Sequence, residues 1–376
     1  MVSTRFSVRD VAIDIVGPSQ ISTGMVKSLT AARVSKGVPA DSPAHSSQAD
    51  ITVQVKAKPP DVIIERAARS RRLPYQFDTA VTAGGLRYQM SALGGKVIYT
   101  VDLDGMPLSG QPWHATATIT NAGWLQLVPS VVVRAATHEH ANMIDYFTAV
   151  ALTEVLEPLL WTHLLERDQT IIHAAAGVSP NGRGVAFTGS GQVGKTAIAL
   201  GLVRHHGWQY LADDLVIIGA DGMHRVPRPL RLAAHHLAIL DGVTRIGGMS
   251  QNTRFNRSRR RIPITDVVTV DRLAATAPLD LLVNINATPA TTTLRHHEVK
   301  RSDLVANVTA AVMSDFWEFL SFMNAAAGLS LAPAANRWHH RVAEIVEASL
   351  PKALLGIDVP HGADLKKVGT FIAQSV

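Results

Sequence analysis

The chain has 376 residues, of which 47 % are hydrophobic and 18 % are charged, and it contains no cysteine. The length is enough for about two domains with buried cores, and the apolar fraction excludes a wholly disordered chain. The lack of cysteine excludes disulfides, iron–sulfur clusters, thiolate zinc sites and a cysteine nucleophile. A net charge of +6 is compatible with an anionic partner but identifies none.

No stretch of the sequence has the pattern of a targeting signal or a membrane anchor. The first ten residues carry charge ahead of any long apolar run, unlike a secretory signal. The two most apolar stretches, 149–165 and 319–335, are interrupted by charged or helix-breaking residues. Neither offers the ~20 clean apolar positions of a spanning helix, so the sequence predicts a cytoplasmic protein with no membrane partner.

The first part of the chain, residues 1–140, predicts a β-rich domain. Residues 50–56 alternate between polar and apolar positions, which is the period of a half-buried strand. Residues 86–93 and 96–103 are extended runs separated by two glycines, which supply the positive φ angles of a tight hairpin turn. Two further extended runs are 115–120 and 124–134. We expect this domain to recognise substrate or to mediate assembly.

The remainder, residues 141–376, predicts an α/β domain. Apolar positions from Leu152 to Leu164 recur every three or four residues, as on the buried face of a helix. Strand-like and helix-like segments then alternate, which is typical of α/β domains. The expected strands are 184–188, 215–218 and 281–285, and the expected helices are 195–206, 302–317 and 336–350.

A phosphate-binding motif lies in this second domain. Its residues fit the pattern G-x-x-x-x-G-K-T: Gly189, Ser190, Gly191, Gln192, Val193, Gly194, Lys195 and Thr196. An apolar strand precedes the motif, and a helix that ends at Gly207 comes after it. The glycines let backbone N–H groups turn toward a polyphosphate, Lys195 can reach the β- and γ-phosphates, and Thr196 can ligate Mg²⁺. The alternative is a glycine-rich turn with a solvated lysine.

Three acidic or imidazole side chains are further candidates for chemistry. Asp213 and Asp214 open an apolar strand, where adjacent side chains point to opposite faces and cannot share one role. One can hold Mg²⁺ or accept the proton of a hydroxyl while the other fixes the site. The alternative is a turn that uses Asp for backbone hydrogen bonds. His173 begins a small apolar strand ahead of the motif, where a hydrogen-bonded core histidine is the more common case.

An arginine-rich segment, residues 254–261, holds five arginines and accounts for most of the net charge. It is compatible with capture of an acidic substrate, a phosphate clamp, nucleic-acid binding or a solvated loop. No recognition-helix pattern accompanies the segment, so we do not expect a nucleic-acid partner.

In these residues the sequence resembles the HPr kinase/phosphorylase family, and more closely the HPr-kinase-like enzymes of peptide-tailoring clusters. The resemblance is an ordered series over about residues 150–245: His173 in an apolar strand, the phosphate-binding motif, a helix of about three turns, and Ala212-Asp213-Asp214. It implies a P-loop fold of the HPr kinase/PEP carboxykinase-like type, preceded by the smaller β-rich domain. It also implies transfer of the γ-phosphoryl group of ATP to a serine hydroxyl, with Mg²⁺ as cofactor.

The resemblance also implies roles for single residues. Lys195 becomes a phosphate contact, Thr196 a phosphate and magnesium contact, Asp213 the base that deprotonates the hydroxyl, and Asp214 a carboxylate on the metal side. His173 becomes a residue beside the phosphate or behind the site. Family enzymes are oligomeric, which makes a homo-oligomer the expected assembly.

The sequence departs from the family after the aspartate pair. The Glu-Arg-Gly-rich signature of the family is not recognisable there, and residues 226–233 contain Arg228 and Arg231 in a Pro-Arg-Pro context instead. Dephosphorylating activity is therefore not implied. The two arginines are candidates for substrate or phosphate contacts, or belong to a surface loop.

The sequence thus predicts an ATP- and Mg²⁺-dependent kinase that acts on a hydroxyl, with serine of a peptide or protein as the acceptor. Two alternatives stay open: a kinase of small-molecule alcohols, and a nucleotide-binding sensor or scaffold that transfers no phosphate.

Overall fold

The computed structural model describes a subset of the chain, and every structural statement concerns these residues. They are 2–9, 11–17, 51–58, 76–83, 86–93, 96–103, 115–121, 157–191, 193–226, 228–232, 236, 240, 245–246, 249–250, 260–288, 292–327, 332–360 and 362–376. They form a mixed α/β structure with several β-sheets and a smaller number of helices. None of the described helices combines the length and the apolarity needed to cross a lipid bilayer.

The chain divides into two compact units. The first comprises residues 1–30, 39–167 and 316–338, and the second comprises 31–38, 168–315 and 339–376. The predicted domain boundary after residue 140 lies outside the described residues and stays a prediction.

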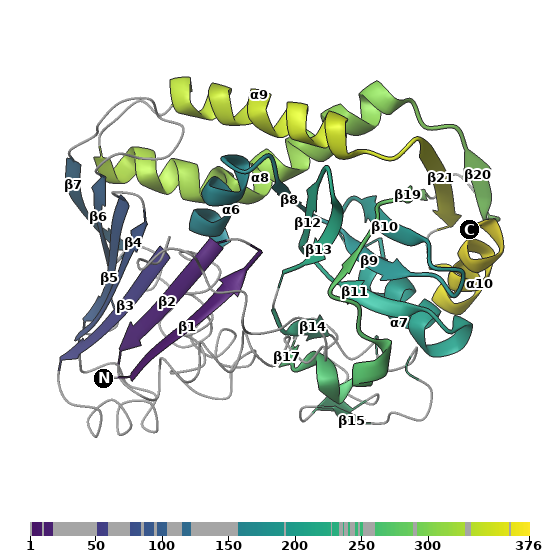
Figure 1. The fold of residues 1–376 in the computed structure, drawn as a ribbon, viewed down its shortest axis with the longest axis horizontal. Helices are drawn as coiled ribbons and strands as arrows, with labels where there is room; N and C mark the ends of the chain where they lie inside the picture. The colour runs from purple at the N-terminus through teal and green to yellow at the C-terminus, as the bar shows by residue number, and fades with distance from the viewer. Residues whose placement is uncertain are drawn as a thin grey trace. The chain divides into compact units, whose positions relative to one another are not determined.

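A seven-stranded sheet dominates the first unit (Figure 1). Its strands are adjacent in chain order: β1 (Val2–Val8), β2 (Val11–Gly17), β3 (Ile51–Lys58), β4 (Gln76–Ala83), β5 (Leu86–Leu93), β6 (Lys96–Leu103) and β7 (Ala115–Asn121). Neighbouring strands are antiparallel except β2 and β3, which are parallel. The predicted hairpin of β5 and β6 and the strands at 50–56 and 115–120 are confirmed, whereas the expected strand at 124–134 lies outside the described residues.

Three aromatic side chains from three helices pack together in the first unit. Trp161 of α6 (Glu157–Leu165) stacks on Phe316 of α8 (Arg301–Ala327), with ring centroids 4.1 Å apart. Trp338 of α9 (Ala332–Ser349) meets Trp161 edge-on at 5.8 Å. All three side chains are buried, so aromatic packing joins the three helices.

The second unit contains a six-stranded sheet and a four-stranded sheet (Figure 1). The larger has the order β11 (Gln209–Ala212), β9 (Ala175–Val178), β10 (Gly184–Gly189), β19 (Leu281–Thr288), β21 (Ala353–Pro360) and β20 (Arg295–His297). Strands β10, β19 and β21 are parallel, and the remaining pairs are antiparallel. The smaller has the order β18 (Thr276–Ala277), β13 (Gly222–Arg225), β12 (Val216–Gly219) and β8 (Thr170–Ile172).

Short elements complete the second unit. Two strand pairs, β14 (Leu230–Leu232) with β17 (Arg260–Ile262) and β15 (Arg245–Ile246) with β16 (Met249–Ser250), are antiparallel. Two 3₁₀ turns lie at Ile264–Asp266 and Val270–Arg272.

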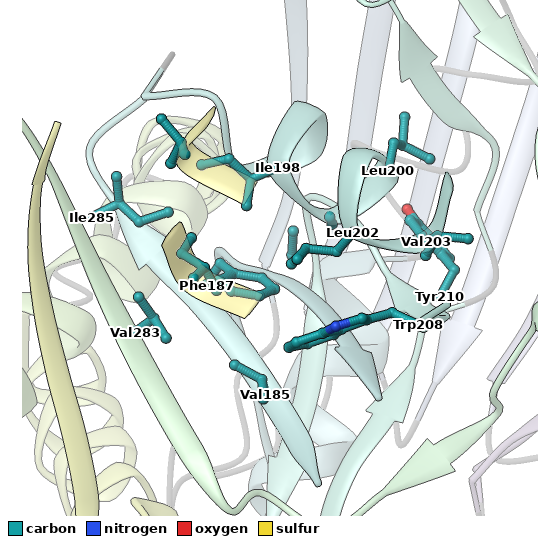
Figure 2. Packing of buried hydrophobic residues seen from close by; sticks show 14 of the residues in the cluster. Val185, Phe187, Ile198, Leu200, Leu202, Val203, Trp208, Tyr210, Val283 and Ile285 are labelled. Atoms are coloured by element: carbon teal, nitrogen blue, oxygen red, sulfur yellow. The ribbon is translucent and has the colours of Figure 1, made fainter. Parts of the chain in front are cut away.

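Helices α7 (Lys195–His206) and α10 (Leu365–Ser375) bury their apolar faces in the core of the six-stranded sheet. Figure 2 shows Phe187 of β10 directed toward Ile198 and Leu202 of α7, with Trp208 beside them. Helix α7 has the predicted bounds, and Gly207 ends it in the left-handed conformation with φ of 72°. This packing fixes the start of α7 at the carboxyl end of β10.

Two short links carry the chain from one sheet of the second unit to the other. His173 and Ala174 connect β8 to β9, and residues 213–215 connect β11 to β12. The expectation that Asp213 and Asp214 open a strand, and that His173 begins one, is therefore wrong. These side chains lie between strands because the strands on either side belong to different sheets.

Replacing Phe187 by alanine tests the core of the second unit. Phe187 is fully buried against α7, so we expect Phe187→Ala to lower the free energy of unfolding by about 3–5 kcal/mol, measured by urea denaturation. Phe371→Ala, at a partly buried ring of α10, is the matched control and should cost clearly less. Equal losses for the two variants would contradict the described packing.

Candidate active site

The phosphate-binding motif forms the turn between β10 and α7, at the carboxyl end of a central strand. Gly189 has φ of 143°, and a Cβ atom there would lie 2.2 Å from the carbonyl oxygen of Ile285. Gly194 has φ of 93°, and a Cβ atom there would lie 3.0 Å from the side chain of Leu365. Position 189 therefore requires glycine for conformation and for space, and position 194 requires it for its positive φ. Gln192 lies outside the described residues.

Lys195 is the first residue of α7, and its buried side chain folds back over the turn. Its Nζ donates hydrogen bonds to the carbonyl oxygens of Gly189, at 2.9 Å, and Ser190, at 3.1 Å. Burial lowers the pKa of Lys195, and the carboxylates of Asp214, Asp213 and Asp315 act in the opposite direction. The ammonium group thus lies inside the turn, where a polyphosphate would need a cation.

Thr196 ties the start of α7 to the link between β11 and β12. Its Oγ1 donates a hydrogen bond of 2.7 Å to Oδ1 of Asp213, whose side chain is buried. Burial, and then the neighbouring Asp214 carboxylate, raise the pKa of Asp213 from 3.8 to about 6, although Thr196 and Arg228 act against this rise. A carboxylate with this pKa is ionised at neutral pH. Its pKa is also close enough to neutral pH for the group to take up a proton.

Asp214 has an unusual backbone and two charged neighbours. Its φ is 68°, and Leu215 N donates across it to the Asp213 carbonyl oxygen at 2.7 Å, so the link closes as a γ-turn. Non-glycine residues rarely adopt this conformation, and such outliers cluster at functional sites. Arg228 Nη1 lies 3.2 Å from Asp214 Oδ2, and His173 Nε2 lies 3.7 Å from Asp214 Oδ1.

The structure thus brings most of the sequence-predicted residues into one cluster within the second unit. Lys195, Thr196 and Asp213 are joined through the turn and its hydrogen bonds, and Asp214 links His173 to Arg228. The cluster arises because the link that holds His173 and the link that holds the aspartates both cross between the same two sheets.

Two other features predicted from the sequence are not placed in this cluster by the described residues. Arg231 lies in β14, whose register places it opposite Arg261 of β17. Residues 251–259, which include most of the arginine-rich segment, are outside the described residues.

Asp315 of α8 belongs to the cluster, but no pattern in the sequence predicts it as a site residue. Its Oδ2 lies 3.4 Å from His173 Nδ1. A single acidic residue in a helix, far along the chain from any motif, gives no indication that it faces a site. Only the packing of α8 reveals the contact.

The residues at the turn suit a magnesium ion that is bound together with a nucleotide. No group of three or more His, Asp or Glu side chains within the described ranges is arranged to hold a metal ion alone. Mg²⁺ needs few protein ligands, since it keeps waters and takes phosphate oxygens in nucleotide sites. The hydroxyl of Thr196 and the carboxylate of Asp214 are hard oxygen donors of the kind it prefers.

A cavity of about 410 Å³ lies elsewhere in the second unit. Its lining includes Leu200 and Arg204 of α7 and Asp271 and Arg272 of a 3₁₀ turn. Neither Lys195 nor the aspartate pair lines it, so the candidate chemistry is not located in this cavity.

The raised pKa of Asp213 makes a prediction about stability and pH. Between about pH 4 and pH 6 the folded protein holds a proton that the unfolded chain releases, so this contribution to stability is lost as the pH rises through 6. We expect the free energy of unfolding of Asp213→Asn to be about 3 kcal/mol higher than that of the wild type at pH 8. This difference in stability should disappear near pH 4. Urea denaturation at both pH values measures it, with Asp266→Asn, at an exposed position, as control. A gap that does not change with pH would contradict the assignment.

Comparisons with known proteins give little further information. No protein-family model matches the chain, and no curated protein does. Among solved structures, the chain is similar to the Hpr(Ser) kinase/phosphatase from Coxiella burnetii, with 16 % sequence identity and a TM-score of 0.22, over 35 % of this chain and 78 % of that chain. A TM-score of 0.22 is too low to establish a shared fold.

Proposed function

We propose that the chain is an ATP- and Mg²⁺-dependent kinase that transfers a phosphoryl group to a hydroxyl, with serine of a peptide or protein as the acceptor. The proposal includes a P-loop domain of the HPr kinase/PEP carboxykinase-like type over residues 141–376 and a β-rich domain over 1–140 that serves acceptor recognition or assembly. The observation that carries it is the 2.7 Å hydrogen bond from Thr196 to Asp213. This bond joins a glycine turn whose sequence fits the phosphate-binding pattern to a buried carboxylate, and a module that only binds nucleotide has no need of such a base.

The chemistry of the proposed reaction assigns one task to each group. The acceptor oxygen forms a bond to the γ-phosphorus, the bond from this phosphorus to the departing ADP oxygen breaks, and the hydroxyl proton passes to Asp213. Lys195 and the N–H groups at the start of α7 neutralise charge on the phosphates. Mg²⁺, held by Thr196 and the aspartate side of the site, supplies further positive charge to the polyphosphate. Catalysis then consists of positioning and charge stabilisation.

The pKa of Asp213 supports its role as the proton acceptor. With a pKa of about 6, the carboxylate is unprotonated at neutral pH and more basic than an ordinary aspartate. Its burial also keeps it away from solvent protons. Asp214 has one carboxylate oxygen near the Arg228 guanidinium and the other near the His173 imidazole, which suits support of the site rather than proton transfer.

Substitution of Asp213 separates a kinase from a nucleotide sensor. We expect Asp213→Asn to bind ATP with nearly wild-type affinity, because Lys195 and the turn are intact, but to transfer phosphate about 10²- to 10⁴-fold more slowly. Lys195→Ala should weaken ATP binding at the same site. Calorimetry gives the affinities, and transfer of radiolabelled phosphate to a library of serine peptides, to small alcohols and to water gives the rates.

The matched control is Asp266→Asn, at an exposed aspartate of the same unit, which should keep the wild-type rate. Wild-type protein that binds ATP tightly but never consumes it would favour the sensor. Radiolabel that appears only on small alcohols would show that the acceptor is a small alcohol and not a peptide. A rate of phosphate transfer in Asp213→Asn equal to that of the wild type would refute the assignment of Asp213 as the base.

Magnesium dependence tests the role of the Thr196 hydroxyl. We expect removal of Mg²⁺ by EDTA to abolish phosphate transfer. Thr196→Val should require about tenfold more Mg²⁺ for half-maximal rate, since it loses an oxygen ligand, whereas Thr196→Ser keeps the hydroxyl and should stay near wild type. Titration of the rate with MgCl₂ measures this. Equal requirements in the valine and serine variants would show that the hydroxyl is no ligand.

A further inference from the structure

Four side chains of alternating charge type form a row at the candidate site. Asp315 Oδ2 lies 3.4 Å from His173 Nδ1, and His173 Nε2 lies 3.7 Å from Asp214 Oδ1. Arg228 Nη1 lies 3.2 Å from the other oxygen of Asp214. The imidazole of His173 therefore stands between two carboxylates, and each oxygen of Asp214 faces a different partner.

The members of this row come from separate elements of the second unit. His173 belongs to the link between β8 and β9, Asp214 to the link between β11 and β12, and Arg228 comes after β13. Asp315 comes from α8, which belongs to neither sheet. The contact with Asp315 therefore adds an anchor for His173 that the two sheets do not provide.

Exposure increases along the row toward Asp315. The side chain of Asp214 is 24 % exposed, that of His173 is 31 % exposed and that of Asp315 is 41 % exposed, whereas Asp213 is buried. Asp213, the chain neighbour of Asp214, is joined to the turn through its hydrogen bond with Thr196. Asp315 thus lies at the solvent end, where it contacts His173, and it acts on Lys195 of the turn through electrostatic attraction only.

We propose that Asp315 is a positioning residue that fixes the orientation of the His173 ring and, through it, the carboxylate of Asp214. Its part in phosphoryl transfer rests on the function proposed above. The contact at Nδ1 keeps Nε2 directed toward Asp214, because a 180° ring flip would put Cδ2 in the place of Nδ1 and Cε1 in the place of Nε2. Both distances are within the range of ion pairs and longer than a direct hydrogen bond, so the orientation comes from electrostatic attraction between neighbouring groups.

Loss of Asp315 has a defined consequence for the site. The ring of His173 loses its partner at Nδ1. Of the contacts in this row, only the ion pair with Arg228 then holds Asp214 in a fixed orientation. The hydrogen bonds of Lys195 and Thr196 do not involve Asp315. We therefore expect the rate of transfer to change and the affinity for nucleotide to stay.

The experiment compares Asp315→Asn with Asp303→Asn. Asp303 is an exposed aspartate in the first turn of the same helix, with a hydrogen bond from neighbouring Ser302, and it serves as the control. We expect Asp315→Asn to lower kcat about tenfold with KM for ATP within about twofold of wild type. Asp315→Glu, which keeps the charge, should restore part of the rate. Asp303→Asn should match wild type in both constants.

A second readout does not depend on any enzymatic activity. In protein labelled with ¹⁵N-histidine, the two ring nitrogens of His173 are identified by the signals that disappear in His173→Gln. These signals should shift in Asp315→Asn and stay in place in Asp303→Asn, with ATP absent.

The two readouts have separate meanings. Unchanged ring signals in Asp315→Asn, or an unchanged kcat where the wild type transfers phosphate, would overturn the proposed role of Asp315. A wild-type protein that transfers no phosphate to any acceptor would overturn the proposed function instead. The ring signals would still decide whether Asp315 orients His173.

Discussion

The hydrogen bond between Thr196 and Asp213 is the interaction on which the candidate site depends. It connects the first turn of α7 to the link between the two sheets of the second unit, so the glycine turn between β10 and α7 and the aspartate pair keep one relative position. The packing of Phe187 against α7 acts in the same direction, because it fixes the helix on the sheet from which the turn emerges. A buried polar contact and an apolar core thus position the same few atoms.

Electrostatics sets the character of the site more than shape does. Burial of Asp213 disfavours its charged form, and repulsion from the adjacent Asp214 carboxylate adds to this cost, which is why the pKa of Asp213 rises to about 6. Arg228 and His173 flank Asp214, and the Arg228 guanidinium offsets part of the repulsion. The two carboxylates therefore differ in behaviour. Asp213 is buried and can take up a proton, whereas Asp214 is partly exposed and lies between cationic or polar neighbours.

Features that obey local rules could be predicted from the sequence, whereas features that depend on contacts between distant segments could not. The bounds of α7, its glycine end and the need for glycine at the turn belong to the first kind, because each is a local matter of backbone geometry. The position of Asp213 and Asp214 was predicted wrongly as a strand, since no local pattern tells that two successive strands belong to different sheets. Asp315 was not found at all, because its contact with His173 joins residues far apart in the chain.

The shortness of the two links between the sheets limits how a sequence of this kind can vary. His173 stands in a link of two residues and Asp214 in a link of three, and paired strands flank both, with a register shift between Tyr210 and Ala212 just before the second link. A residue inserted into either link would rotate the polar side chain away from its partners or break the register of a strand. Substitutions can accumulate around this site, but relatives that keep its geometry must keep the length of both links, so gaps in an alignment should fall elsewhere.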